Sequence, residues 1–101
     1  MQLWVKWTDL AKRDLEHIET YLTEQTSAVF AIDYLLSVLT TIDNVIKRFP
    51  EAGRPGLVSG TREWVMPRSP FILVYRYVQS DQSIEVIRVL HHSRSTLQEL
   101  F

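Results

Sequence analysis

One segment divides this chain of 101 residues into two unlike parts. Residues 50–60, PEAGRPGLVSG, contain all three glycines and two of the four prolines. Glycine and proline favour turns and interrupt regular structure. Apolar residues recur at helical spacing before this segment and form short strand-like runs after it. The sequence therefore predicts a helical part followed by a sheet-forming part, within a single domain over residues 1–101.

The first part predicts a short strand and two helices. Residues 3–7 alternate as in a strand. Helical spacing predicts one helix over residues 10–25, capped by Thr8 or Asp9, and a second over residues 27–48. Because only two or three residues separate the helices, we expect an antiparallel hairpin. In the second helix the predicted buried stripe consists of Ala28, Ala31 or Ile32, Leu35, Leu39, Ile42 and Ile46, widened by Phe30, Tyr34 and Val38.

The second part predicts three consecutive antiparallel strands over residues 61–66, 71–78 and 84–91, followed by a short helix over residues 95–101. The element order is then βααβββ(α). A helical hairpin packed on a mainly antiparallel sheet is an α+β architecture.

Arginine recurs along the predicted strands. Residues 51–94 carry six arginines and four acidic residues, although the whole chain has a net charge of −1. Arginine's planar fork binds phosphate and carboxylate groups, so a row of arginines on a sheet is a candidate anion-binding surface. Arg76 and Arg88 also allow a second interpretation: each lies between apolar neighbours, where a carboxylate such as Glu63 or Glu85 would satisfy it internally. We expect Arg88 to share a face with Val86 and Leu90.

Trp64, His91 and His92 are weaker candidates for a functional site. Trp64 could stack on a nucleic-acid base or pack across strands. His91 and His92 are adjacent in a strand and point to opposite faces, so they do not suit one metal ion. One of them could act as a general acid or base near the arginines. The chain has no cysteine. We predict neither a metal site nor a cofactor.

Several apolar residues exceed what one hairpin and one sheet need for a core, notably Trp4, Val29, Phe30 and Leu36. A partner peptide could cover them as a helix in a groove or as an added strand, and a homodimer would cover them as well. The nearly uncharged run over residues 27–42 is too short to span a membrane. We expect a soluble, cytoplasmic protein.

Read together, the motifs resemble a known family. Gly60-Thr61-Arg62-Glu63, Val74-Tyr75-Arg76 and the run from Arg88 to Arg94, RVLHHSR, occur in this order. The chain resembles the ParE branch of the RelE/ParE toxin superfamily over essentially its whole length. The resemblance implies the toxin of a bacterial type II toxin–antitoxin pair. It also implies a cognate antitoxin that wraps the toxin with an amphipathic segment, in a possible heterotetramer.

The superfamily has two activities. ParE-like members inhibit DNA gyrase, and RelE-like members are ribosome-dependent mRNA endonucleases whose clustered cations act on one phosphate. The second strand has Trp64, Val65 and Met66 where the nucleases place basic residues, which favours the gyrase inhibitor. The alternatives are the nuclease, which would cut mRNA on the ribosome, and a non-toxic member that only binds antitoxin.

The predicted site residues follow from this interpretation. The target-binding residues are Arg62, Trp64, Arg68, Arg76, Arg88 and Arg94. The antitoxin-binding residues are Trp4, Phe30 and Leu36. If the chain were a nuclease, the catalytic residues would be Arg62, Arg68, Arg94 and His92.

Overall fold

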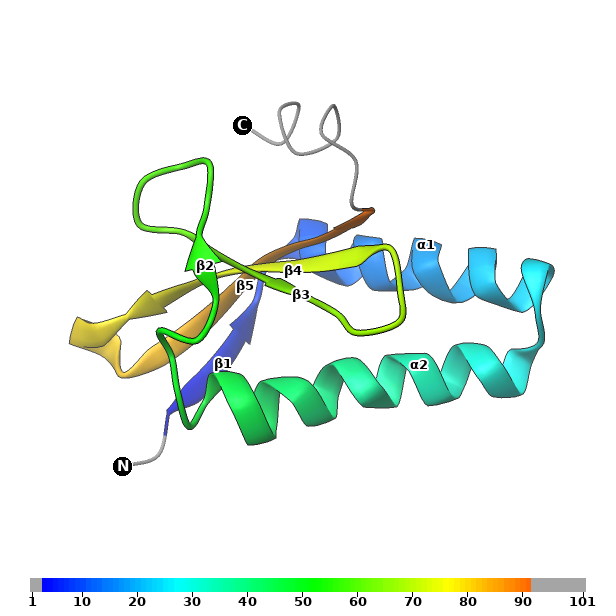
Figure 1. The fold of residues 1–101 in the computed structure, drawn as a ribbon, viewed down its shortest axis with the longest axis horizontal. Helices are drawn as coiled ribbons and strands as arrows, with labels where there is room; N and C mark the ends of the chain where they lie inside the picture. Colours follow the sequence, from blue (N-terminus) through cyan, green and yellow to red (C-terminus); the bar gives the residue numbers. More distant parts are fainter. Residues whose placement is uncertain (1–2, 92–101) are drawn as a thin grey trace.

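The computed structural model describes residues 3–91 of the chain and confirms the α+β architecture. Two helices lie along one side of a sheet (Figure 1). The elements are β1 (Trp4–Trp7), α1 (Asp9–Gln25), α2 (Ala28–Thr41) continuing into the π-helix η1 (Ile42–Ile46), β2 (Arg54–Pro55), β3 (Arg62–Val65), β4 (Phe71–Val78), the 3-10 turn η2 (Gln79–Asp81) and β5 (Ser83–His91). The predicted helix over residues 95–101 lies outside the described residues.

The sheet has the strand order β1-β5-β4-β3-β2. The predicted antiparallel run of β3, β4 and β5 is confirmed. The N-terminal strand β1 pairs in parallel with the last strand, with Trp4 opposite Ser83 and Trp7 opposite Val86. The short strand β2 is an addition to the prediction, because its two residues lie inside the glycine- and proline-rich segment and carry no strand pattern of their own.

Side-chain caps start both helices. Thr8 caps α1: its hydroxyl oxygen accepts a hydrogen bond from the Ala11 N–H at 3.0 Å. The same hydroxyl donates to the Ile87 carbonyl at 2.7 Å, which fixes the start of α1 against β5. Ser27 caps α2 by accepting from the Phe30 N–H at 3.1 Å. Each cap satisfies a first-turn N–H that has no partner within its helix.

Ala11, Ile18 and Leu22 recur at helical spacing along α1, and all three are buried. The predicted stripe of α2 is partly wrong, because Ala28, Phe30 and Leu39 are exposed, and of the alternatives Ala31 and Ile32 only Ala31 is buried. Apolar residues occupy most of the circumference of α2, so their spacing alone could not select the buried face. The residues of α2 and η1 that enter the core are Ala31, Val38, Ile42 and Ile46.

A bulge in β5 changes which residues share a face. Tyr75 pairs with Val86 while Val74 pairs with Arg88, so β5 has one extra residue, Ile87, between them. Val86 consequently faces the helices, whereas Leu90 belongs to a smaller apolar cluster with Ile72 and Val74. The expectation that Arg88 shares one face with both Val86 and Leu90 is therefore wrong, since a bulge breaks strict alternation.

The segment Ala28–Ile46 is long and apolar enough, by composition, to cross a membrane. Within the fold, however, one face of this segment supplies four residues to the core shared with the sheet. This face of the segment is therefore part of the core of the domain.

Candidate functional site

Arg88, a predicted target contact, forms an ion pair with the first helix. Its guanidinium donates to both carboxylate oxygens of Asp14, from Nε at 2.8 Å and from a terminal nitrogen at 3.0 Å. The Val89 N–H donates to the same carboxylate at 2.9 Å. This pairing raises the pKa of Arg88. The structure therefore matches the internal-pairing interpretation of Arg88, with a partner on α1 instead of the strand acids we named.

Arg76 on β4 and Arg62 on β3 also have partners within the chain. Arg76 bonds to Glu85 directly opposite it on β5, one of the two acids expected from the sequence. Arg62 donates to the carbonyls of Gly53 at 2.8 Å and Glu51 at 3.2 Å, which fixes the loop before β2. Arg76 remains half exposed, so its pairing leaves part of the guanidinium accessible.

A further pair joins β2 to β3. The Arg54 side chain donates to the buried carboxylate of Glu63 at 2.9 Å. Because Glu63 is 7% exposed, this partner satisfies a carboxylate that would otherwise be destabilising. The sequence pattern predicts only a turn at Arg54, because the adjacent residues in the sequence do not indicate a strand.

The aromatic rings of Trp64 on β3 and Tyr75 on β4 pack towards the core. Trp64 packs against the core, and its indole nitrogen is buried without a hydrogen-bond partner within residues 3–91. Tyr75 is fully buried, and its hydroxyl donates to the Pro50 carbonyl and accepts from the Gly53 N–H, at 2.8 and 2.9 Å. Burial raises the pKa of Tyr75, and the bond from Gly53 opposes that rise. Both rings therefore pack within the structure, which for Trp64 agrees with the packing interpretation.

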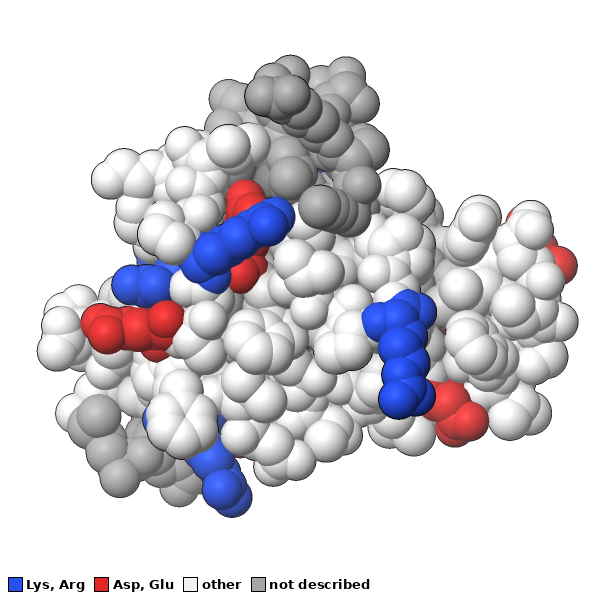
Figure 2. All heavy atoms as spheres, viewed as in Figure 1, with Lys and Arg blue, Asp and Glu red and all other residues white. Residues whose placement is uncertain are grey.

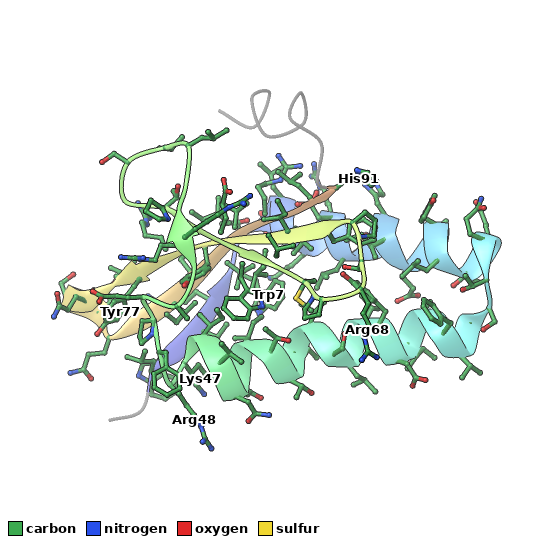
Figure 3. The ribbon with its side chains drawn as sticks, viewed as in Figure 1. Trp7, Lys47, Arg48, Arg68, Tyr77 and His91 are labelled. Atoms are coloured by element: carbon green, nitrogen blue, oxygen red, sulfur yellow. The ribbon has the colours of Figure 1, made fainter. Side chains whose placement is uncertain are left out.

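Arg68 differs from the other sheet arginines. It lies in the turn between β3 and β4, where its φ of 60° is a left-handed conformation that disfavours most side chains. The adjacent Ser69 hydroxyl forms a 2.8 Å hydrogen bond with the Tyr34 hydroxyl of α2, which anchors the turn to the helix. Arg68 is exposed and has no ion pair among residues 3–91. Figure 3 shows it on the side of the turn that faces α2.

The turn forms one wall of an open groove of about 250 Å³. Arg68 lies at this groove together with aromatic rings from both helices and from β4, namely Tyr21, Phe30, Tyr34 and Phe71. Tyr34 and Phe71 contact each other with ring centroids 5.6 Å apart. Burial raises the pKa of Tyr34, while its bond with Ser69 lowers it. The groove therefore combines an apolar floor with an arginine at its edge.

His91 lies at a neighbouring cavity of about 380 Å³, which His17 also lines. The His91 ring meets Phe71 edge to face, with centroids 5.8 Å apart. Figure 3 shows His91 at the end of β5 beside α1. The sequence does not predict that His17 and His91 lie at one cavity, because their proximity depends on α1 packing beside the end of β5. His92 and Arg94 lie outside the described residues.

Charge on this side of the molecule is sparse. Figure 2 shows blue groups beside red groups at the sheet end, and further separate blue groups on an otherwise mostly white surface. Arg62, Arg76 and Arg88 each bond to a group of the chain itself, and of these three Arg76 alone is exposed.

Comparison with known proteins identifies the family. The profile of the ParE toxins of type II toxin–antitoxin systems, parDE, matches residues 5–96. The chain belongs to the ParE toxin family. A protein of Sinorhizobium fredii (strain NBRC 101917 / NGR234), named "Putative toxin Y4kP", is 31% identical over 87 residues, which cover 86% of this chain and 85% of that protein.

Solved structures agree on the fold of this ParE-family chain. The chromosomal ParDE toxin–antitoxin system of P. aeruginosa matches with a TM-score of 0.80 at 23% identity, covering 91% of this chain and 98% of that one. The RelBE2 toxin–antitoxin complex of Mycobacterium tuberculosis matches with a TM-score of 0.65 at 22% identity, covering 90% and 99%. The YoeB/ParE toxin of Agrobacterium tumefaciens matches with a TM-score of 0.60 at 25% identity, covering 90% and 100%.

Proposed function

We propose that this ParE-family toxin acts in the cytoplasm by binding and inhibiting DNA gyrase, and that a cognate antitoxin neutralises it. Family membership supports the toxin role. The choice of a binding mechanism over catalysis rests on one observation: three of the four predicted target-binding arginines within residues 3–91 are bonded to groups of the chain itself.

This observation bears on catalysis because cleaving RNA requires stabilising charge on one phosphate as the transition state forms. Several cations must then converge on a single point. Arg88 bonds to Asp14 on α1, Arg62 bonds to loop carbonyls, and Arg68 lies at the opposite end of β3. This arrangement favours a surface that binds a partner over a catalytic site.

Within the proposed target surface, Arg68 is the leading contact. It is exposed, its turn is anchored to α2 through Ser69, and its guanidinium has no ion pair in the described range. Arg76 is a second contact because half of its side chain remains exposed. Arg94 remains a predicted contact outside the described residues. Arg62, Arg88 and Trp64 are dropped from the surface, since the fold uses them internally.

The antitoxin is proposed on chemical grounds. Trp4 and Phe30 are 69% and 50% exposed, which is unusual for large aromatic rings. Phe30 lies in the aromatic groove beside Arg68, which suits a segment with an apolar anchor and an acidic neighbour. Among similar structures, the P. aeruginosa ParDE system and the M. tuberculosis RelBE2 complex are toxin–antitoxin assemblies. Their fold supports an antitoxin partner here, in a possible heterotetramer.

A ribosome-dependent mRNA endonuclease remains the second proposal. The observation that favours it is the fold likeness to E. coli RelE, with a TM-score of 0.58 over 96% of this chain. His91 and His17 share a cavity and would supply acid–base groups in that case.

One set of assays separates the proposals. The purified toxin is added to gyrase supercoiling reactions and to cell-free translation, and is expressed in cells without antitoxin. Inhibited supercoiling with trapped cleaved DNA and intact mRNA supports the gyrase proposal. Cut mRNA with normal supercoiling supports the nuclease, and harmless expression with neither effect supports a chain that only binds antitoxin.

Arg68→Glu tests the proposed contact. We expect it to reduce gyrase inhibition by about tenfold or more, since a reversed charge opposes the anionic partner. Arg13→Glu is the matched control, because Arg13 is an exposed arginine on α1. Equal inhibition by both variants would remove Arg68 from the surface.

A further inference from the structure

A cavity of about 620 Å³ lies where the end of η1 meets β4. Its described lining residues include two cations, Lys47 and Arg48, two aromatic residues, Phe49 and Tyr77, and one acid, Glu51. It shares no described lining residue with the aromatic groove or with the histidine cavity considered above. Its volume lies in the range of small-ligand sites. Figure 3 shows the two cations at the end of η1, with Tyr77 on the sheet beside them.

The turn after η1 fixes the backbone of Phe49. The Phe49 N–H donates to the Val45 carbonyl at 2.8 Å, and the Phe49 carbonyl accepts from the Ala52 N–H at 2.8 Å. The ring of Phe49 is nevertheless 65% exposed. A large ring held in solvent on a fixed backbone can stack on a planar ligand at little cost in conformational entropy. Tyr77, which is half-buried on β4, adds a second aromatic ring to the same cavity.

The loop on one side of the cavity is bonded to the sheet. The Tyr75 hydroxyl donates to the Pro50 carbonyl at 2.8 Å, and Arg62 donates to the Glu51 carbonyl at 3.2 Å. Both donors belong to the central strands, Tyr75 to β4 and Arg62 to β3. The sheet therefore holds this side of the cavity in place before any ligand arrives.

Lys47 and Arg48 place positive charge beside the rings. Arg48 is exposed and forms no ion pair within residues 3–91. Lys47 pairs with Asp43 at 3.8 Å, and because Asp43 is 66% exposed, solvent weakens this pair. Cations also suit the C-terminal end of a helix, where the macrodipole is negative. That role requires neither an exposed ring nor a cavity, so it does not account for the whole arrangement.

We propose that this cavity binds single-stranded nucleic acid, with a base stacked on Phe49 and phosphates at Lys47 and Arg48. An unpaired base offers the flat face that a duplex hides between neighbouring base pairs, and stacking on an aromatic side chain tolerates any sequence. The phosphates beside that base supply the negative charge that two adjacent cations attract. The proposal concerns the toxin alone and does not rest on inhibition of gyrase.

A strand matches this surface because each of its units combines an aromatic base with an anion. Lys47, Arg48 and Phe49 are consecutive and present the same combination of charge and ring. A free mononucleotide offers that combination once only. Since most of the Phe49 ring and the side chain of Arg48 are exposed, both can contact units of a strand that extends beyond the cavity.

Binding of a labelled single strand tests the stacking contact. Purified full-length toxin is titrated into a fluorescein-labelled thymidine oligonucleotide of about 12 nucleotides, and anisotropy reports the Kd. We expect Phe49→Ala to raise the Kd by about tenfold. Val29→Ala is the matched control, because Val29 is 70% exposed at the other end of the helical segment. Melting temperatures close to that of the parent show that both variants fold.

The dependence on salt tests the two cations. Each phosphate contact with a single strand contributes about −0.7 to the slope of log affinity against log salt concentration. Two contacts predict a slope of about −1.4 for the parent, and Arg48→Ala should reduce it to about −0.7. Arg13→Ala, at an exposed arginine of α1, should keep the slope of the parent.

Four results would overturn the proposal. Absence of binding at low salt excludes the site, and a Phe49→Ala variant that binds as tightly as the parent excludes the stacking contact. Equal slopes for Arg48→Ala and Arg13→Ala place the phosphate contacts elsewhere. Thymidine monophosphate that displaces the strand at the same nucleotide concentration as unlabelled oligonucleotide would assign the cavity to free nucleotides. No gyrase, ribosome or antitoxin enters these assays, so they can fail separately from the proposed function.

Discussion

Strand β5 holds a charged side chain in a shielded position, whereas the outer face of α2 holds apolar side chains in solvent, and the molecule treats the two differently. Arg88 on β5 is largely shielded from solvent, and the Asp14 carboxylate accepts both of its donors. The aliphatic side chains of α2 lie in solvent, and nothing within residues 3–91 covers them. A shielded charge destabilises every folded molecule unless the fold satisfies it. Exposed aliphatic side chains destabilise a single folded molecule only slightly, so a binding partner can cover them instead of the fold.

Removing the partner of Arg88 should have the largest effect. We expect Asp14→Ala to lower the free energy of unfolding by about 3–5 kcal/mol, because it leaves a guanidinium and the Val89 N–H without their acceptor. Urea denaturation measures the change. Glu16→Ala, on an exposed position of the same helix, should stay within about 0.5 kcal/mol of the parent. Similar losses in both variants would mean that the ion pair does not stabilise β5 against α1.

Two isoleucines on the same helical segment compare its two faces directly. Ile42 is 2% exposed and Ile32 is 54% exposed. Ile42→Ala should cost about 2–4 kcal/mol of stability through the cavity it creates. Ile32→Ala should cost less than about 0.5 kcal/mol when measured at concentrations where the chain is monomeric. A large loss for Ile32→Ala in the monomer would contradict the division of α2 into a core face and an outer face.

The smallest expected effect concerns the buried hydroxyl of Tyr75. Tyr75→Phe should cost about 1 kcal/mol at neutral pH, since the Gly53 N–H and the Pro50 carbonyl lose their partner. Tyr77→Phe is the control, because Tyr77 is on the same strand and only half-buried. Chemical denaturation of both variants measures the difference, and an equal loss would mean that the hydroxyl bonds do not anchor the loop.

The same tyrosine predicts a dependence on pH. Burial raises the pKa of Tyr75 above its ordinary value, so the folded state favours the neutral phenol. Its contribution is fully present below the unfolded pKa of about 10 and is lost as pH rises through the higher folded value. The free energy of unfolding should therefore fall at alkaline pH, and less steeply in Tyr75→Phe. An identical alkaline decline in that variant would contradict the role of Tyr75.

Sequence patterns predicted most of the fold because α1 has a helical periodicity, and β3, β4 and β5 are short apolar runs bounded by turn residues. They did not predict the buried face of α2, where apolar residues surround the helix and Ile32 looks the same as Ile42. They also did not predict the partner of Arg88, since Asp14 and Arg88 are 74 residues apart and meet only after α1 packs on β5. The bulge at Ile87 changes which side of the sheet the following residues of β5 face, and the local sequence pattern does not indicate it.

The pairing of β1 with β5 has a consequence for synthesis. Trp4 can pair with Ser83 and close the sheet only after Ser83, 79 residues later in the chain, has been synthesised. At a translation rate of roughly 5–20 residues per second, the first strand stays unpartnered for about 4–16 seconds on each ribosome. The sheet can therefore close only after the last strand has emerged from the ribosome, so the complete fold forms at the end of synthesis.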